Sequence, residues 1–250
     1  MTRQGYVLHA SRTVVFWTYK AANTSIVHAL AYDVLKLPRD RRDPRLMIEP
    51  LLVGWPVALD LIADGYRSIG LIREPYDRLV SAFLHIFVAR AGRGIRQLKD
   101  LEASGRRGLQ QMRGDVGQFE GITFREFVAH CVAEVRARQG EPNLDDHWNT
   151  QIPFALYERG FRYDHLFPLT RSGAFFEALS GLVGTRVRER RINVHRRSWG
   201  FRHNLVDVTS TRYCGWKALH HTRNFEDPEL RAAVEAAYEP DYAYYRTLAS

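Results

Sequence analysis

The chain has 250 residues, of which 45% are hydrophobic, so it is long enough for one sizeable domain with an apolar core. Its formal net charge of +8 favours anionic partners such as nucleotides, nucleic acid, a membrane surface or acidic glycans. No apolar run approaches the ~20 residues that span a bilayer, and the N-terminus lacks a hydrophobic signal segment. These features predict a cytoplasmic globular protein, in which Cys131 and Cys214 are free thiols.

The first recognisable motif is a strand, a short turn and a helix. Residues 13–18 are β-branched and aromatic, which predicts a buried strand, and residues 25–35 repeat apolar side chains at helical spacing. The turn between them reads Lys20-Ala21-Ala22-Asn23-Thr24-Ser25. Free N–H groups and the positive end of the helix dipole favour an anion at such a turn. Two alternatives are a plain helix cap and a nucleotide-triphosphatase loop, although the loop's glycines are missing and its lysine is displaced.

A second motif along the chain has the same order of strand, turn and helix. Residues 46–63 are apolar and expected to be partly helical, residues 66–72 predict a second strand, and residues 75–89 predict a helix. Arg73 leaves that strand at its carboxyl end, and Ser81 lies two helical turns later. The repeated order predicts an α/β fold with a mostly parallel central sheet, which brings Lys20 and Arg73 to the same edge.

The second half of the chain is expected to complete this sheet and its helices. Residues 91–121 show little periodicity and predict a mobile surface segment with a short helix near residues 96–101. Thr123 and Glu126 form a capping-box pattern at the start of a helix over residues 123–138. A third strand is predicted at 161–169, and helices at 172–182 and 227–237, followed by an aromatic tail at 238–245. We expect one domain over residues 1–250.

Two of these segments resemble the sulfotransferases that use 3′-phosphoadenosine 5′-phosphosulfate (PAPS). The turn Lys20–Ser25 matches the family's K-x-x-x-T-S pattern, and the segment Arg73–Ser81 matches R-[DE]-P-x-x-R-x-x-S at every fixed position. The segment Asp145–Gln151 is similar to the D-x-H-W-x-P-Q stretch of the carbohydrate-transferring branch, with Thr150 in place of proline. The tail Tyr238–Tyr242 resembles the family's Y-x-x-D-Y.

The resemblance implies a fold related to the P-loop nucleotide triphosphatases and a set of site residues. Lys20 would neutralise the leaving phosphate and act in catalysis, and Arg73 and Ser81 would hold the 3′-phosphate. The 5′-phosphosulfate would be bound by the turn, through Lys20, Ala21, Ala22, Asn23, Thr24 and Ser25. The basic segment 190–198, with Arg196 and Ser198, would close over the nucleotide or receive an anionic acceptor, unless it is only a solvated loop. No metal is expected.

The general base is left open between two residues. In the uronyl-sulfating relatives a histidine lies in the loop before the second strand, where this chain has none. Glu49 lies nearest to that place, and some sulfotransferases use a glutamate as the base. His147 is the other candidate, although a histidine there could equally serve to hold the loop 145–151 together. Either residue would accept the proton of the attacking hydroxyl group.

The resemblance implies sulfuryl transfer to a hydroxyl-bearing acceptor, a carbohydrate or glycolipid, by a cytoplasmic, bacterial relative of the Golgi enzymes. One alternative is a P-loop-like kinase that needs magnesium and ATP. Another is a non-catalytic polyanion-binding protein, although the chain has no recognisable nucleic-acid motif and its arginines are scattered. The sequence names neither the acceptor nor the oligomeric state.

Overall fold

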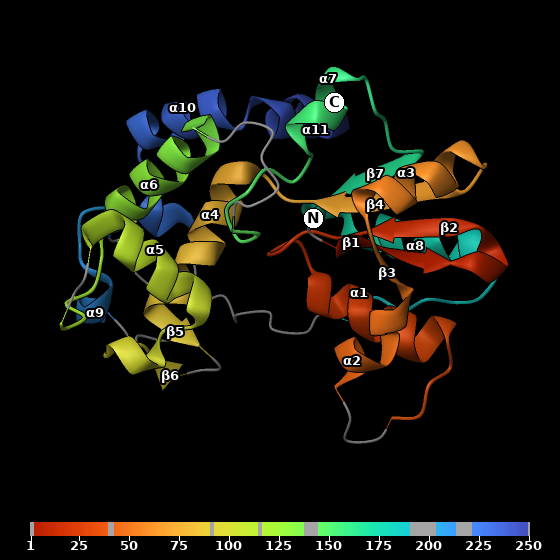
Figure 1. The fold of residues 1–250 in the computed structure, drawn as a ribbon, viewed down its shortest axis with the longest axis horizontal. Helices are drawn as coiled ribbons and strands as arrows, with labels where there is room; N and C mark the ends of the chain where they lie inside the picture. The colour runs from red at the N-terminus through yellow and green to blue at the C-terminus, as the bar shows by residue number, and fades with distance from the viewer. Residues whose placement is uncertain are drawn as a thin grey trace. The chain divides into compact units, whose positions relative to one another are not determined.

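The structure is a computed structural model that describes residues 3–39, 43–90, 93–114, 117–137, 145–190, 204–213 and 222–249. The chain divides into two compact units, each assembled from separate stretches of sequence. The first unit comprises Met1–Glu74, Gln151–Val194 and Ala243–Ser250, and the second comprises Pro75–Thr150 and His195–Tyr242. Figure 1 shows the helices and strands of both units.

The first unit is built on a sheet that has five strands among the described residues, in the order β3-β1-β2-β4-β7. The strands are β1 (Arg3–Leu8), β2 (Thr13–Phe16), β3 (Leu52–Gly54), β4 (Arg67–Ile72) and β7 (His165–Pro168). β2, β4 and β7 run parallel, as the sequence predicts, and the α/β class is confirmed. β1 and β3 were not predicted, and β1 pairs antiparallel with both β2 and β3.

Helices cover both faces of this sheet, because successive strand residues point to opposite sides. Val15 and Ile69 face α1 (Asn23–Ala29) and α8 (Ser172–Val183), and these residues share one buried cluster. Val14 and Phe16 face the other way and pack with Ala58 of α3 (Trp55–Ala63). Figure 1 shows α1 and α3 on opposite sides of the sheet.

The remaining helices of the first unit are short. α1 continues into a π-helical turn at Leu30–Val34, and α2 (Pro44–Ile48) leads through a 3₁₀ turn at Glu49–Leu51 into β3. α7 (Phe154–Glu158) precedes β7, and a 3₁₀ turn at Leu169–Arg171 precedes α8. The aromatic tail is itself helical: α11 (Glu239–Ala249) starts in the second unit and ends in the first.

The second unit is mainly helical around an aromatic core. Its helices are α4 (Pro75–Phe83) with a π-helical turn at Leu84–Val88, α5 (Ala103–Arg113), α6 (Phe124–Ala137), α9 (Ser210–Tyr213) and α10 (Pro228–Ala237). Short strands β5 (Ala89–Arg90) and β6 (Arg93–Gly94) pair, and 3₁₀ turns lie at Leu98–Asp100 and Thr222–Phe225. Phe83 contacts the rings of Phe124, Phe127 and Phe225. No helix among the described residues combines the length and the apolar character that a membrane span requires.

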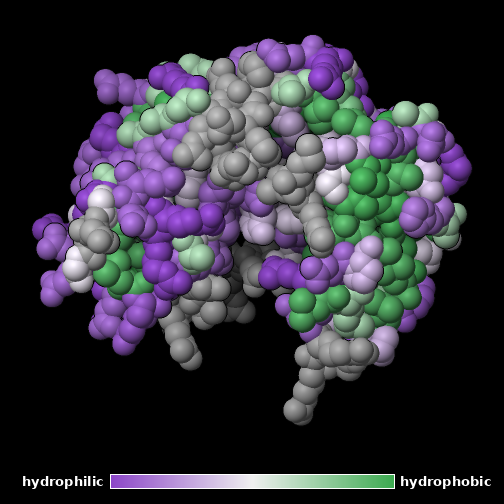
Figure 2. Space-filling view, viewed as in Figure 1, coloured by the Kyte–Doolittle hydropathy of each residue, from purple (hydrophilic) through white to green (hydrophobic). Residues whose placement is uncertain are grey.

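The prediction of a mobile segment at 91–121 was wrong at residues 103–113, whereas the short helix predicted near residues 96–101 is present as the 3₁₀ turn at Leu98–Asp100. α5 occupies its middle, and Gly105, Gly108 and Leu109 on this helix are buried. Its sequence, ASGRRGLQQMR, is polar, and Figure 2 shows that the surface of α5 and α6 is mostly hydrophilic. The buried contact is made through glycines and one leucine, and such a narrow contact leaves little apolar periodicity in the sequence.

The capping box of α6 is confirmed. The Thr123 N–H and hydroxyl group both donate to Oε2 of Glu126, at 2.7 and 2.9 Å, and the Glu126 N–H donates back to the Thr123 hydroxyl oxygen at 3.1 Å. The predicted end of α8 also holds, because Gly184 follows it with a φ of 68°. These local signals fix where the helices begin and end.

Arg78 of α4 is the most unusual residue in the core of the second unit, because its side chain is only 2% exposed. Its guanidinium donates to the backbone oxygens of Asn149, at 2.5 Å, and Asp146, at 2.9 Å. Burial lowers the pKa of Arg78, and the buried carboxylate of Asp241 opposes that effect. Arg78 therefore fastens the turn at 145–149 to α4 and neutralises a buried carboxylate of the C-terminal segment.

We predict that Arg78→Met lowers the free energy of unfolding by about 3–5 kcal/mol, because the buried Asp241 loses its compensating charge. Arg78→Lys keeps the charge but cannot reach both carbonyl oxygens, so its loss should be smaller. Urea denaturation measures both, with Arg106→Met on the exposed face of α5 as the control, expected within about 0.5 kcal/mol of the unsubstituted protein. Equal stability of the Arg78→Met and Arg106→Met variants would contradict this role.

Candidate functional site

The turn after β2 has a strained backbone. Lys20 and Ala22 have φ values of 68° and 58°, in the left-handed region that residues other than glycine rarely adopt. Ala22 is the N-cap of α1, and no side chain of the described residues caps the helix there. The plain-cap alternative therefore fails, and the first N–H groups of α1 have no partner within the helix itself. Strain of this kind is typical of binding loops, and a helix N-terminus without a side-chain cap suits an anion.

Arg73 follows β4 and lies beside this turn. β4 pairs in parallel with β2, with Phe16 opposite Gly70, so the two carboxyl ends are neighbours. Nη1 of Arg73 donates to the backbone oxygen of Lys20 at 3.3 Å. The structure therefore brings Lys20 and Arg73 together at one edge of the sheet in the first unit.

Gln151 holds this edge together, a role that sequence reasoning missed. Its side chain is buried, and its Oε1 accepts from the Thr18 hydroxyl at 3.3 Å and from the Arg73 N–H at 2.9 Å. Its Nε2 donates to the Arg73 backbone oxygen at 2.7 Å. One carboxamide thus joins the segments that follow β2 and β4. The only sequence signal was its place at the end of the D-x-H-W-x-x-Q segment.

Arg45 is a second residue that the sequence did not single out. Its Nη2 donates to Oγ1 of Thr24 at 2.9 Å, so α2 adds an exposed guanidinium to the turn. Asp43 caps α2 by accepting from the Arg45 N–H at 2.9 Å, and Pro44 occupies the first helical position. The Asp-Pro-Arg order is a helix-start signal that could have placed Arg45 at a helix end.

Glu49 belongs to the same neighbourhood. It follows Arg45 by four residues at the end of α2, and its side chain is exposed. Burial raises the pKa of the nearby Tyr6 to about 12; Arg45 acts against this, while Tyr19 and Glu49 add to it. Arg45 and Glu49 thus both act on the Tyr6 phenol, and Arg45 also binds Thr24 of the turn.

Cationic side chains act on α1. Burial lowers the pKa of His28 on this helix, and Arg190 and Arg45 lower it further. Arg190 is fixed there by Asp33, whose Oδ1 accepts from its Nη2 at 2.5 Å, and it lies over the Tyr32 ring. The charge of Arg190 is balanced by Asp33, so Arg45 is the cation here that more clearly favours an anion near the turn.

The predicted residues of the second unit are placed as follows. Ser81 lies on α4 and is half-buried. Nδ1 of His147 lies 2.8 Å from Oδ1 of Asp145, and Nε2 lies 3.6 Å from Oε1 of Glu102. Burial acts to raise the pKa of Asp145, but hydrogen bonds from His147 and Ser104 lower it overall. His147 is thus oriented by a carboxylate, as a base or a metal ligand would be.

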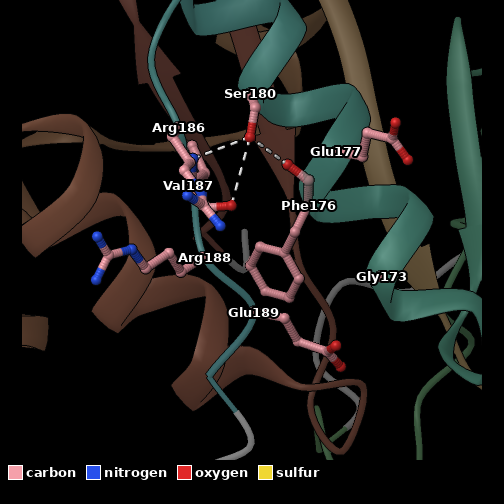
Figure 3. Close-up of a pocket in the computed structure, with 8 residues that line it drawn as sticks. All are labelled: Gly173, Phe176, Glu177, Ser180, Arg186, Val187, Arg188 and Glu189. Atoms are coloured by element: carbon pink, nitrogen blue, oxygen red, sulfur yellow. Dashed lines mark hydrogen bonds between the residues drawn. The ribbon is translucent and has the colours of Figure 1, made fainter.

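Of the basic segment 190–198, which was predicted to contact the nucleotide or an anionic acceptor, the structure describes only Arg190. Arg196 and Ser198 lie outside the described residues. The segment that leads to it lines a cavity of about 520 Å³ with α8 (Figure 3). Ser180, which lines this cavity, accepts from the Val187 N–H at 2.9 Å. The eight residues that line the cavity include none of the predicted site residues.

Comparison with known proteins gives one finding. The model of the sulfotransferase family matches residues 56–246, which include Arg73–Ser81 and Asp145–Gln151 but not the turn at Lys20. No curated protein and no solved structure matches the chain. The match covers more than half of the chain and agrees with the α/β fold and with the residues that carry the resemblance. The chain therefore belongs to the sulfotransferase family, and it is a sulfotransferase.

Proposed function

We propose that this sulfotransferase takes its sulfuryl group from PAPS and transfers it to a hydroxyl group of a carbohydrate or glycolipid. The observation that carries the proposal is the pairing of the strained Lys20 turn with Arg73 at adjacent strand ends. A donor with phosphates at both ends of one nucleoside needs two separate cationic contacts. The N-terminus of α1, which no side chain caps, and the neighbouring Arg73 guanidinium meet that need.

The residues around the turn have distinct proposed roles. N–H groups of residues 22–25, with the Thr24 and Ser25 hydroxyl groups, bind the 5′-phosphosulfate, and Arg45 adds a charge through Thr24. Arg73 binds the 3′-phosphate, a role that Ser81 shares by resemblance. The bound donor supplies an activated sulfuryl group. Lys20 balances the negative charge that grows on the leaving oxygen, as in phosphoryl transfer.

Glu49 is the general base that the first unit favours. Its side chain is exposed, and it follows by four residues Arg45, which itself contacts the turn. In this role Glu49 accepts the proton of the acceptor hydroxyl as its oxygen attacks. His147 remains the alternative, since Asp145 orients its ring.

The donor is tested by calorimetry with 3′-phosphoadenosine 5′-phosphate, the product nucleotide. We predict binding without magnesium and an affinity roughly 10- to 100-fold weaker in Arg73→Ala, because a charge-assisted contact to phosphate is lost. Arg67→Ala is the matched control, since Arg67 is an exposed arginine at the other end of β4. Tighter binding of magnesium-ATP would favour a kinase, and salt-sensitive binding of any polyanion without turnover would favour a binding protein.

The base is tested with Glu49→Gln, which keeps the size of the side chain and removes the proton acceptor. We predict that kcat falls roughly 10²- to 10⁴-fold, while the affinity for the product nucleotide is unchanged. A screen of hydroxylated sugars and glycolipids supplies the acceptor for this assay. Normal turnover in Glu49→Gln together with loss in His147→Gln would transfer the role to His147.

Gln151 is a positioning residue, and its test follows from its three hydrogen bonds. In Gln151→Leu the Arg73 backbone loses both its donor and its acceptor, so Arg73 should be less well placed. We predict nucleotide affinity about tenfold weaker, from hydrogen bonds that contribute about 1 kcal/mol each. Gln110→Leu, on the exposed face of α5, is the control. Unchanged affinity in a folded Gln151→Leu variant would show that Arg73 does not need this support.

A further inference from the structure

Three segments of the second unit bring metal-binding side chains to one place. His85 lies in the π-helical turn after α4, Glu102 is the N-cap of α5, and His147 lies in the turn at 145–149. One ligand atom from each residue lies within 4.8 Å of the other two. These residues are far apart in the sequence, so the fold, and not a local motif, assembles the cluster.

The chemistry of the cluster suits a transition metal. Two imidazoles and one carboxylate form the donor set of zinc sites that keep a fourth position for water. Nε2 of His147 lies 3.6 Å from Oε1 of Glu102, and Nε2 of His85 lies 3.8 Å from Oε2. Direct hydrogen bonds are shorter, about 2.7–3.2 Å, whereas ligand atoms around tetrahedral zinc are roughly 3.3 Å apart. Small side-chain rotations therefore place a shared cation between these atoms.

A second layer of contacts orients His147 for this role. Nδ1 of His147 lies 2.8 Å from Oδ1 of Asp145, which leaves Nε2 as the ligand atom. Zinc-bound histidines commonly have such a carboxylate on the other ring nitrogen. Asp145 also accepts from Nη2 of the exposed Arg107 at 3.2 Å, so its own position is fixed.

An ion can reach the cluster from solvent. The side chain of His85 is 39% exposed, while those of Glu102 and His147 are 17% and 11% exposed. Glu102 also lines a surface cavity of about 470 Å³ formed by residues at the start of α5. The site is thus open on one side, where a water molecule completes the coordination.

We propose that His85, Glu102 and His147 bind one zinc ion, with Asp145 as the residue that orients His147. The ion fastens the end of α4, the start of α5 and the turn at 145–149 to one another. This proposal departs from the sequence-based expectation that the chain binds no metal. It does not depend on the identity of the sulfuryl donor or acceptor.

The test is calorimetric titration of the untagged, metal-free full chain with zinc chloride, paired with cobalt(II) as a spectroscopic probe. We predict one zinc per chain, and a cobalt complex with the visible absorption of a four-coordinate site. His85→Ala should weaken zinc binding at least tenfold, and Asp145→Asn should weaken it 10- to 100-fold through loss of orientation. His9→Ala, an exposed histidine of the first unit, is the control for incidental binding.

Melting temperatures distinguish loss of the zinc site from misfolding of the variant. Because His85 is partly exposed, its alanine variant should fold, and circular dichroism checks this. Zinc should raise the melting temperature of the unsubstituted protein and of His9→Ala but not of His85→Ala. Absence of binding, or equal binding by His85→Ala and the unsubstituted protein, would overturn the proposal. Nucleotide affinity is measured separately, so failure here leaves the proposed donor site unaffected.

Discussion

The parallel pairing of β2 and β4 is the constraint on which the candidate donor site depends. It places the ends of two strands side by side, so that residues separated by about fifty positions in the chain, Lys20 and Arg73, become neighbours. Backbone pairing alone does not fix the chain beyond the last strand residues. The Gln151 carboxamide extends the connection by bonding Thr18 and both backbone groups of Arg73. A neutral amide suits this position, because a buried carboxylate would attract the guanidinium that the ligand needs.

Buried and exposed arginines have different roles in this chain. Arg78 is enclosed and uses its guanidinium on backbone oxygens, so it stabilises the fold. Arg45 is exposed at a helix start and contacts only a hydroxyl oxygen among the bonds described for its guanidinium. Burial of a charge is costly unless it is compensated, which explains why Arg78 has both carbonyl partners and Asp241 nearby. The net charge of +8 therefore says little by itself about how many cations serve binding.

The sequence predicted the parts of the fold that carry strong local signals. β2, β4 and β7, the capping box of α6 and the end of α8 at Gly184 follow from β-branched, aromatic or apolar runs, cap residues and a left-handed glycine. β1 and β3 could not be predicted, because their stability comes from pairing with β2 and β1 and not from their own composition. α5 was missed because it packs through glycines. Arg45 and the cluster at His85 were invisible for a similar reason: each depends on a contact between distant segments.

One short segment of the chain, Asp145–Gln151, contributes residues to both units. Asp145 orients His147. The backbone oxygens of Asp146 and Asn149 accept hydrogen bonds from the buried Arg78. The backbone oxygen of Trp148 accepts one from the Tyr238 hydroxyl. All of these contacts lie in the second unit, and two residues after Asn149 the side chain of Gln151 binds the first. The turn at 145–149 must itself be rigid, since Arg78 binds the oxygens of Asp146 and Asn149 together only in this one shape. The buried guanidinium of Arg78 and the buried phenol of Tyr238 hold its backbone carbonyls and supply that rigidity. The family pattern has a proline at the position of Thr150. In this chain the Thr150 N–H instead donates to Oδ1 of Asn149 at 2.8 Å.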